Sequence, residues 1–189
     1  MKTVLKRKTW LFLCLIVIVP IQLLFAKPTG WIDLGRAKVS FEIPKSWKTF
    51  EKVMGFPLLI TSPRVKGARI TISVTPSDVK DFGLKDTDFS SNENTFKEDA
   101  LRWLGSKSGK VREFYPYKKE EWSKETVAHV YGWSYDLGGT TFVERSMYVL
   151  CQKQVFHIKT MYKEKYNAKD LPKINNLLKS FECQPGAKL

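Results

Sequence analysis

The sequence predicts an α+β domain in which an antiparallel β-sheet is flanked by helices. Several stretches alternate apolar and polar residues, which is the two-residue period of strands with one buried face. Two other stretches carry apolar residues at helical spacing. The strand patterns come in runs followed by single helix patterns, without the regular strand–helix alternation that builds parallel sheets.

Short apolar stretches predict strands in the first half of the chain. Residues 31–34 form a short strand, and residues 37–43 alternate apolar and polar side chains until Pro44 ends the pattern. Residues 56–60 are a second apolar run, and residues 68–74 alternate again. We expect the last three of these segments to pair as an antiparallel meander.

The clearest strand pattern lies in the second half. Residues 127–137 place apolar and aromatic side chains at every second position, and residues 142–151 and 155–162 are rich in β-branched and aromatic types. Gly138-Gly139 supplies the positive φ angles that two-residue hairpin turns favour. Residues 111–122 are basic and less regular, which is typical of an irregular strand. The sequence therefore predicts several long neighbouring strands here.

Two helices are expected, one on each side of this strand pattern. Residues 77–94 are polar, acidic and rich in turn-forming types, so we expect a long loop before the first helix. Residues 96–104 and residues 171–181 carry apolar side chains on one side at helical spacing. Pro172 fits the first turn of the second helix, where a missing N–H costs no hydrogen bond.

The first 26 residues have the layout of an export signal. A cationic start is followed by a nearly unbroken apolar run over residues 10–26, interrupted by Pro20 and Gln22, and polarity returns at Lys27. We expect cleavage after Ala26, which leaves residues 27–189 as one domain outside the cytoplasm, either periplasmic or secreted. An uncleaved N-terminal anchor is the alternative, because the run is close to the length of a membrane span.

The chain is strongly basic. It carries 32 Lys and Arg residues against 19 Asp and Glu, a net charge of +13. Removing the four cations of the leader leaves the remaining domain near +9. Such a charge draws a protein toward anionic lipids, cell-wall polymers, nucleic acid or acidic proteins. A solvated, lysine-rich surface without a dedicated partner is the simpler interpretation.

Two cysteines, Cys151 and Cys183, lie outside the leader. An even number of cysteines in an oxidising compartment favours one disulfide bond. The alternative is two separate buried thiols, since spacing in a sequence does not show whether two Cα atoms approach closely enough to be joined.

Two short motifs frame the part of the chain between residues 31 and 183. Residues 41–47 (FEIPKSW) run from a strand through a proline to a tryptophan, and residues 177–181 (LLKSF) end the last predicted helix. With these motifs and its order of elements, the chain resembles the PsbP-like superfamily, which includes the photosystem II PsbP subunit and DcrB-like bacterial envelope proteins.

The resemblance implies an α/β/α sandwich built around an antiparallel sheet. It also implies a binding role, since members mostly bind other macromolecules and share no catalytic constellation. No active-site residues are therefore carried over to this chain. The export signal fits the envelope-protein branch, although fold by itself is a weak guide to a specific role.

The residues themselves give little sign of catalysis. His129 and His157 lie on predicted strands, and a pair facing each other across the sheet would bind a metal with a carboxylate. Close ligand spacing and a Gly-x-Ser-x-Gly elbow are both missing from the sequence. We therefore predict no catalytic residues, no cofactor and no metal, and keep a metal protein or enzyme using these histidines as the alternative.

A basic and aromatic stretch is the predicted binding surface. Aromatic rings among cations stack on ligands or sit at a membrane interface. The aromatic row Tyr131, Trp133 and Tyr135 is interpreted as sheet core rather than a ligand groove. The residues of the predicted surface are Lys107, Lys110, Arg112, Phe114, Tyr115, Tyr117, Lys118 and Lys119.

These observations predict an exported, non-catalytic binding protein that acts in envelope assembly or maintenance. Its expected partner is another envelope protein or a polyanion, and nucleic acid is not expected because exported proteins rarely meet it. Electrostatic attachment to an anionic membrane or cell-wall polymer is a further alternative, which predicts binding that weakens steeply with salt.

Overall fold

A computed structural model describes residues 30–35, 37–63, 70–76, 86–151 and 154–185. The expected leader, part of the predicted strand 68–74 and half of the predicted loop 77–94 lie outside these residues. Within the described residues, no helix has both the length and the apolar character needed to cross a membrane.

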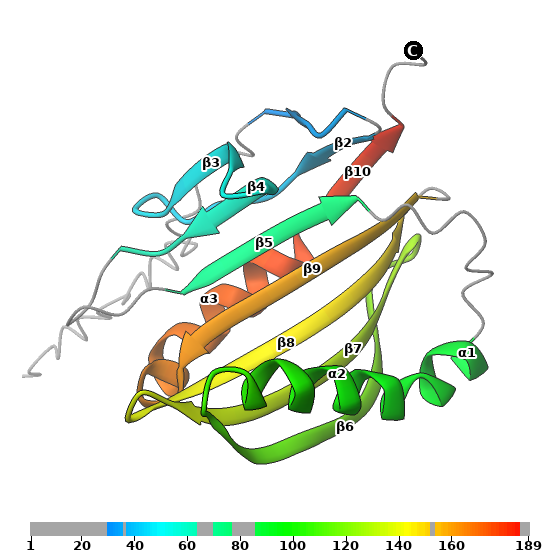
Figure 1. The fold of residues 1–189 in the computed structure, drawn as a ribbon. Coiled ribbons are helices and arrows are strands. Elements are labelled where there is room, and N and C mark those ends of the chain that lie inside the picture. The colour runs from blue at the N-terminus through cyan, green and yellow to red at the C-terminus, as the bar shows by residue number, and fades with distance from the viewer. Residues whose placement is uncertain (1–29, 36, 64–69, 77–85, 152–153, 186–189) are drawn as a thin grey trace, which may run out of the picture.

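Most strands belong to one antiparallel sheet of seven strands, in the order β3-β4-β5-β9-β8-β7-β6 (Figure 1). A smaller antiparallel sheet has the order β1-β2-β10. The large sheet consists of β3 (Lys48–Val53), β4 (Phe56–Thr61), β5 (Thr71–Pro76), β6 (Lys110–Ser123), β7 (Thr126–Leu137), β8 (Thr140–Cys151) and β9 (Gln154–Lys163). The small one consists of β1 (Ile32–Asp33), β2 (Ala37–Ser40) and β10 (Glu182–Pro185).

The two longer helices lie on opposite faces of the large sheet. Helix α2 (Glu93–Gly105), preceded by the short α1 (Asp86–Ser91), crosses one face, and α3 (Asn167–Lys179) lies behind the other (Figure 1). Successive side chains of β7 point to alternate faces. Ala128 and Val130 join the larger core cluster with α3, whereas Trp133 and Tyr135 join a second cluster under α2.

The long strands occupy nearly the predicted ranges. Gly138 and Gly139 both have positive φ, 56° and 70°, and connect β7 to β8 as expected. The irregular stretch 111–122 is strand β6, whose pairing with β7 shifts register at three places. Bulges of this kind explain why the stretch lacks strict alternation.

Part of the predicted loop 77–94 is helical instead. Residues 86–91 form α1, and α2 already begins at Glu93. The sequence of α1, DTDFSS, has weak intrinsic helix propensity. Tertiary contacts stabilise it, because Phe89 is buried, stacks on His129 with ring centroids 4.1 Å apart, and accepts a 2.6 Å hydrogen bond from the Tyr131 hydroxyl at its carbonyl.

Two further expectations were wrong. The meander is β3-β4-β5, and the strand predicted at 37–43 instead pairs with β1 and β10 in the small sheet. Strand β3 is exposed over residues 48–52, so it lacks the alternation that reveals a strand. Pro172 lies inside α3 rather than in its first turn, because the helix begins at Asn167.

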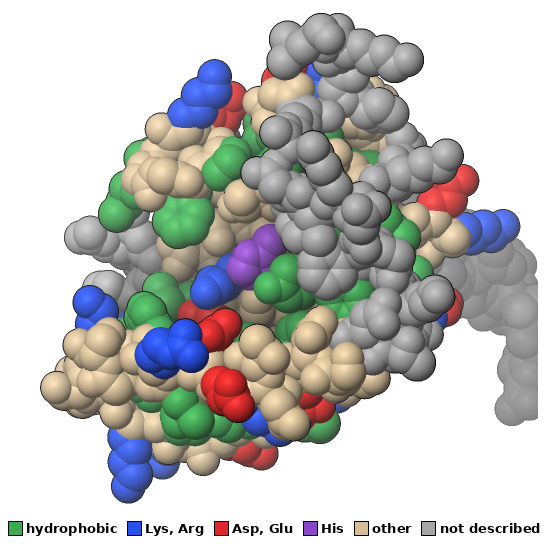
Figure 2. All heavy atoms as spheres, turned by 45° about the vertical axis from the view of Figure 1, so that its right-hand side comes forward, with side chains coloured by type: hydrophobic (Ala, Val, Ile, Leu, Met, Phe, Trp, Pro, Cys, Tyr) green, Lys and Arg blue, Asp and Glu red, His purple; other side chains and the backbone are tan. Residues whose placement is uncertain are grey.

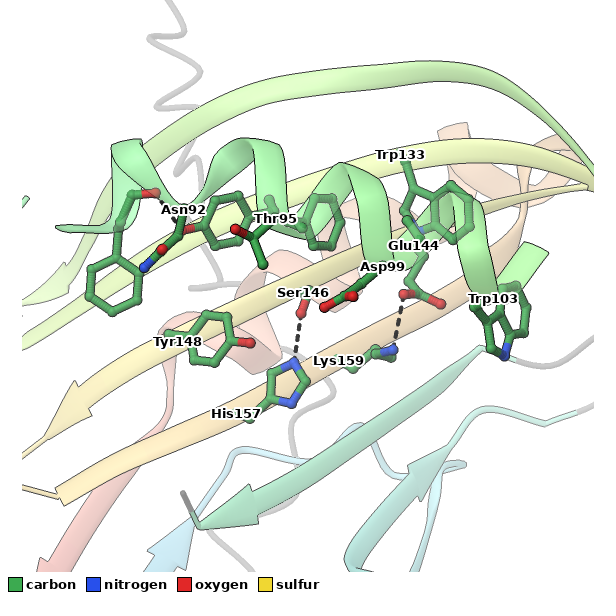
Figure 3. A pocket seen from close by; sticks show the side chains of 14 residues that line it. Asn92, Thr95, Asp99, Trp103, Trp133, Glu144, Ser146, Tyr148, His157 and Lys159 are labelled. Carbon is green, nitrogen blue, oxygen red and sulfur yellow. Dashed lines mark hydrogen bonds and ion pairs between the residues drawn. The ribbon is translucent and has the colours of Figure 1, made fainter. Parts of the chain in front are cut away.

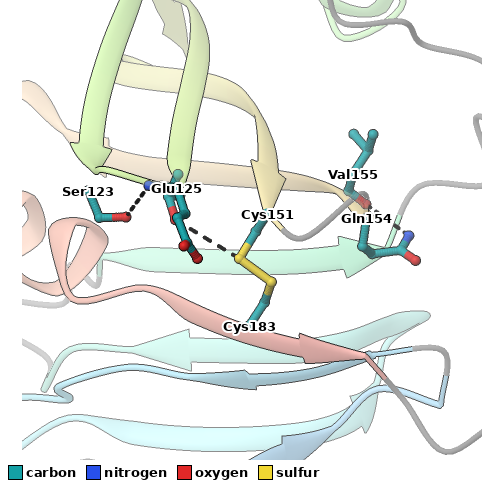
Figure 4. The surroundings of a disulfide bond; sticks show 7 residues. Ser123, Glu125, Cys151, Gln154, Val155 and Cys183 are labelled. Carbon is teal, nitrogen blue, oxygen red and sulfur yellow. Dashed lines mark hydrogen bonds between the residues drawn. A yellow bond between two sulfur atoms is a disulfide. The ribbon is translucent and has the colours of Figure 1, made fainter.

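A disulfide bond joins the two sheets. Cys151 ends β8, Cys183 lies in β10, and their Cα atoms are 6.2 Å apart (Figure 4). Both residues are buried. The pairing agrees with the prediction from the even cysteine count, and it fixes the last described strand against the end of a central one.

Replacing both Cys151 and Cys183 by serine is expected to lower the free energy of unfolding by about 3–4 kcal/mol, the entropy of closing a loop of this length in the unfolded chain. Urea unfolding with and without reductant measures it. The wild type should lose a similar amount in reductant, and the double variant should not respond. Unchanged stability in both cases would contradict the structural role.

Candidate functional site

A groove runs between α2 and the neighbouring face of β8 and β9 (Figure 3). In the space-filling view a histidine side chain lies in a hollow with basic, acidic and apolar side chains around it (Figure 2). The helices contribute Phe89, Asn92, Thr95, Phe96, Asp99, Ala100 and Trp103 to the lining. The sheet contributes Tyr131, Trp133, Glu144, Ser146, Tyr148, His157 and Lys159.

Strand register brings the sheet residues of the groove together. In one row across the sheet, Tyr131 of β7 pairs with Ser146 of β8, which pairs with Lys159 of β9. In an adjacent row, Trp133 pairs with Glu144. Directly opposite residues on one face of an antiparallel pair have their Cβ atoms about 5 Å apart. The pattern therefore places polar groups of β8 and β9 beside aromatic rings of β7.

Aromatic rings form the apolar wall of the groove. Trp133 is only 2% exposed, and its ring stacks on Phe114 at 5.8 Å. Trp103 of α2 meets Trp133 edge to face at 6.1 Å but keeps 43% of its surface exposed. Phe96 stacks on Tyr131 at 5.0 Å. The aromatic row interpreted as core is thus buried, and two of its members, Tyr131 and Trp133, also line the groove.

A buried carboxylate lies beside this wall. Glu144 is 7% exposed, and its Oε1 is 3.1 Å from Nζ of Lys159. A buried charge needs such a partner, because losing the other charge would leave it desolvated and uncompensated. The Lys159 side chain is 42% exposed, and Asp99 of α2 points into the same space (Figure 3). The groove therefore holds two carboxylates and one ammonium group.

His157 is hydrogen bonded to a serine in the groove. Its Nε2 lies 2.6 Å from Oγ of Ser146, and its ring stacks on Tyr148 at 4.8 Å. Burial, with a smaller contribution from the ammonium group of Lys159, lowers the pKa of His157 to about 4. Burial and then the charge of Asp99 raise the pKa of Tyr148. Both rings are therefore neutral at neutral pH.

The two histidines do not face each other. Tyr148 lies between them, paired with His129 on one side and with His157 on the other. Two strand spacings, about 10 Å, therefore separate their backbones, and the Tyr148 ring stacks on His157 at 4.8 Å. Among the described residues, no group of three or more His, Cys, Asp or Glu side chains is arranged to hold a metal.

The predicted binding surface is divided between the two faces of the sheet and its edge. Phe114 and Tyr117 pack on the α2 side, where Tyr117 donates or accepts a 2.7 Å hydrogen bond with Nδ1 of His129. Tyr115 lies on the α3 side, packed against the larger core cluster. The aromatic rings of this set therefore contact the protein's own helices and strands.

The basic members of that predicted surface lie along the edge strand and just before it. Lys107 follows α2, and Lys110, Lys118 and Lys119 are exposed on β6. Arg112 is bound to neighbouring acids, with its Nη1 3.3 Å from Glu164 and its Nε 3.6 Å from Asp136. The structure thus separates these cations from most of the aromatic rings that the sequence interleaves with them.

The polar groups of the groove were not predicted from the sequence. Glu144 and Ser146 flank Arg145 in a polar run of β8, so alternation does not show which face of the strand is buried. Both are buried because α1 and α2 lie over this face. In the observed register Glu144 lies opposite Trp133 and Ser146 opposite Tyr131, and the sequence alone does not give this register.

Solved structures show what this fold is similar to. Cyanobacterial PsbP (CyanoP) from Synechocystis sp. PCC 6803 matches with a TM-score of 0.60 and 8% identity, over 87% of this chain and 96% of that one. LpqN, involved in cell envelope biogenesis of Mycobacterium tuberculosis, matches with a TM-score of 0.51 and 14% identity, over 84% and 90%. The chain therefore has the PsbP-like fold that the two motifs indicated.

Sequence comparisons add no closer assignment. No protein-family model matches the chain, and no curated protein matches it significantly. At such low identity the structural likeness establishes the fold alone.

Stability should fall as the pH drops from about 6.5 to 4. His157 has a folded-state pKa near 4, below its unfolded value of about 6.5, so the unfolded chain binds more protons in that window. His157 is expected to lower the free energy of unfolding by about 3 kcal/mol over this pH range. Urea unfolding at several pH values should show it, and His157→Gln should lose that part of the slope. An imidazole that titrates near 6.5 by NMR would contradict this.

Proposed function

We propose that the chain is an exported, non-catalytic binding protein that acts in envelope assembly or maintenance. Its binding site is the groove between α2 and strands β8 and β9, and its ligand is a segment of another envelope protein. The observation that carries the proposal is an aromatic wall next to an ion pair. In this pair the carboxylate is buried and the ammonium group is partly exposed. The positions of α2 and α3 on opposite faces of the large sheet support the further proposal of an α/β/α sandwich.

The chemistry of the groove suits a peptide segment with an apolar side chain and a polar or charged group. Tryptophan and tyrosine are the residue types that contribute most to protein interfaces. Trp103 offers an exposed ring, and the carboxylates of Asp99 and Glu144 give the groove a place for a cation or an N–H donor. Apolar walls with a few placed polar groups are the usual composition of binding sites.

Trp133 adds a further polar group to the groove wall. Its indole N–H is buried and has no hydrogen-bond acceptor within the part of the chain that the structure describes. Buried donors are nearly always paired in folded proteins. An acceptor brought by a ligand would satisfy it.

The location proposed for this activity comes from the leader and from the fold. The cationic and apolar start of the chain has the order of an export signal. The fold is shared with LpqN, which is involved in cell envelope biogenesis. A disulfide bond between Cys151 and Cys183 is typical of proteins that work in an oxidising compartment.

A second candidate function is catalysis by Ser146 and His157. The observation that favours it is their 2.6 Å hydrogen bond, since a serine nucleophile needs a base at such a distance and a pKa near 4 keeps the imidazole neutral. Against it, Ser146 is 4% exposed, so a substrate has little access to its hydroxyl.

Photocrosslinking from the groove tests the binding proposal. A benzoylphenylalanine in place of Trp103 is expected to form an adduct with a specific envelope protein in living cells. The same residue in place of Leu101 is the matched control, because Leu101 is also an exposed apolar residue of α2 but does not line the groove. Equal adducts from both positions, or none from either, would contradict the proposed site.

A second variant in the same crosslinking system distinguishes binding from catalysis. Ser146→Ala removes the hydroxyl but leaves the aromatic wall, so the Trp103 adduct is expected to persist. A fluorophosphonate probe that labels the wild type and not Ser146→Ala would instead establish the serine as a nucleophile. The two outcomes are distinct, since the first is read from the crosslinked partner and the second from the covalent label.

A further inference from the structure

The β3–β4 hairpin exposes apolar side chains at its tip. Met54 is 84% exposed, which is the largest exposure among the large hydrophobic residues that the structure describes. Phe56 follows in the next strand at 39%, and Phe50 of β3 is 40% exposed. Single exposed apolar residues are common, but three within seven positions of one hairpin are not explained by chance exposure alone.

The turn itself is occupied by a residue that the backbone does not favour. Val53 pairs with Phe56, so Met54 and Gly55 form a two-residue loop, and both have positive φ, 53° and 79°. Such turns favour asparagine, aspartate or glycine at the first central position. A bulky side chain at positive φ costs conformational energy. Folding therefore does not account for Met54, which neither packs on the core nor suits the turn.

Exposed lysines lie along this hairpin. Lys52 is two residues before Met54, whereas Lys48 and Lys45 lie at and before the start of β3, farther from the tip, and Glu51 is the exposed acid within the strand. Their long apolar stems can lie along a lipid surface while the ammonium groups stay at the level of the headgroups. Without the leader the chain carries a net charge near +9, which has the sign needed to approach an anionic surface.

We propose that the tip of the β3–β4 hairpin inserts into the headgroup region of an anionic lipid membrane. Met54 would enter the apolar boundary, with the phenylalanines and lysines of the hairpin at the interface. A projecting apolar residue on a hairpin strand that carries exposed lysines fits a fluid anionic bilayer better than a protein, which would have to supply a preformed pocket of the right shape. The contact is independent of the proposed groove, since it uses different residues of the sheet.

Vesicle partitioning of the exported form tests this contact. Vesicles of phosphatidylcholine with 30% phosphatidylglycerol are the probe, and pure phosphatidylcholine is the lipid control. Met54→Asn is expected to weaken partitioning about tenfold, the order expected for losing a buried methionine side chain. Lys48→Gln with Lys52→Gln should weaken it by a similar factor and reduce its salt dependence. Leu101→Asn, at another exposed apolar residue, should have no effect.

The asparagine variant also separates membrane contact from a structural role. Asparagine suits the turn better than methionine, so Met54→Asn is expected to unfold at the same or a higher urea concentration than the wild type. Weaker partitioning together with undiminished stability would support the proposal. Lower stability would assign Met54 a structural role and overturn it.

A depth reporter gives a second readout that does not depend on affinity. An NBD fluorophore attached at Met54→Cys should shift its emission to the blue when anionic vesicles are added, and one attached at Leu101→Cys should not. Equal shifts at both positions, or partitioning that is the same for Met54→Asn and the wild type, would overturn the proposal. A Met54 that crosslinks to a protein instead of entering lipid would do so as well.

Discussion

The antiparallel pairing of β7, β8 and β9 determines where the polar groups of the groove lie. Because Tyr131, Ser146 and Lys159 share one row, and Trp133 and Glu144 another, Ser146 and Glu144 are each held opposite an aromatic residue of β7. A shift of one residue in any of these strands would turn the whole set to the opposite face. The positions of these groups are therefore as fixed as the backbone ladder that supports them.

The groove also buries polar groups, and this loss of solvation has to be compensated by partners within the protein. Covering Glu144 and Ser146 with α1 and α2 removes water from polar groups, which is unfavourable unless each finds a partner. The ion pair with Lys159 and the hydrogen bond to His157 meet that demand inside the sheet. Lys159 itself stays partly solvated. The charges of the site are therefore paired, but the ammonium group of Lys159 remains accessible to solvent.

The sequence predicts the elements that depend on neighbouring residues, and it misses those that depend on contacts between residues far apart in the chain. Strict alternation located β7, and the glycine pair located its turn, because both patterns arise from neighbours along the chain. Helix α1 and strand β10 were missed, since α1 depends on Phe89 stacking on a distant ring and β10 on pairing with β2. The groove was missed for the same reason, because a strand pattern does not show that a helix will cover its polar side.

The small sheet brings together segments from the two ends of the described chain. Val39 pairs with Cys183, which lies 144 residues later, and Ile32 pairs with Val39 from the other side. Contacts between such distant residues form slowly, because closing a long loop costs entropy before pairing repays it. A chain threaded through a membrane from its N-terminus would hold β2 without its second neighbour until residues 182–185 had passed. The small sheet is therefore completed only when residues 182–185 are available, so its folding depends on nearly all of the described sequence.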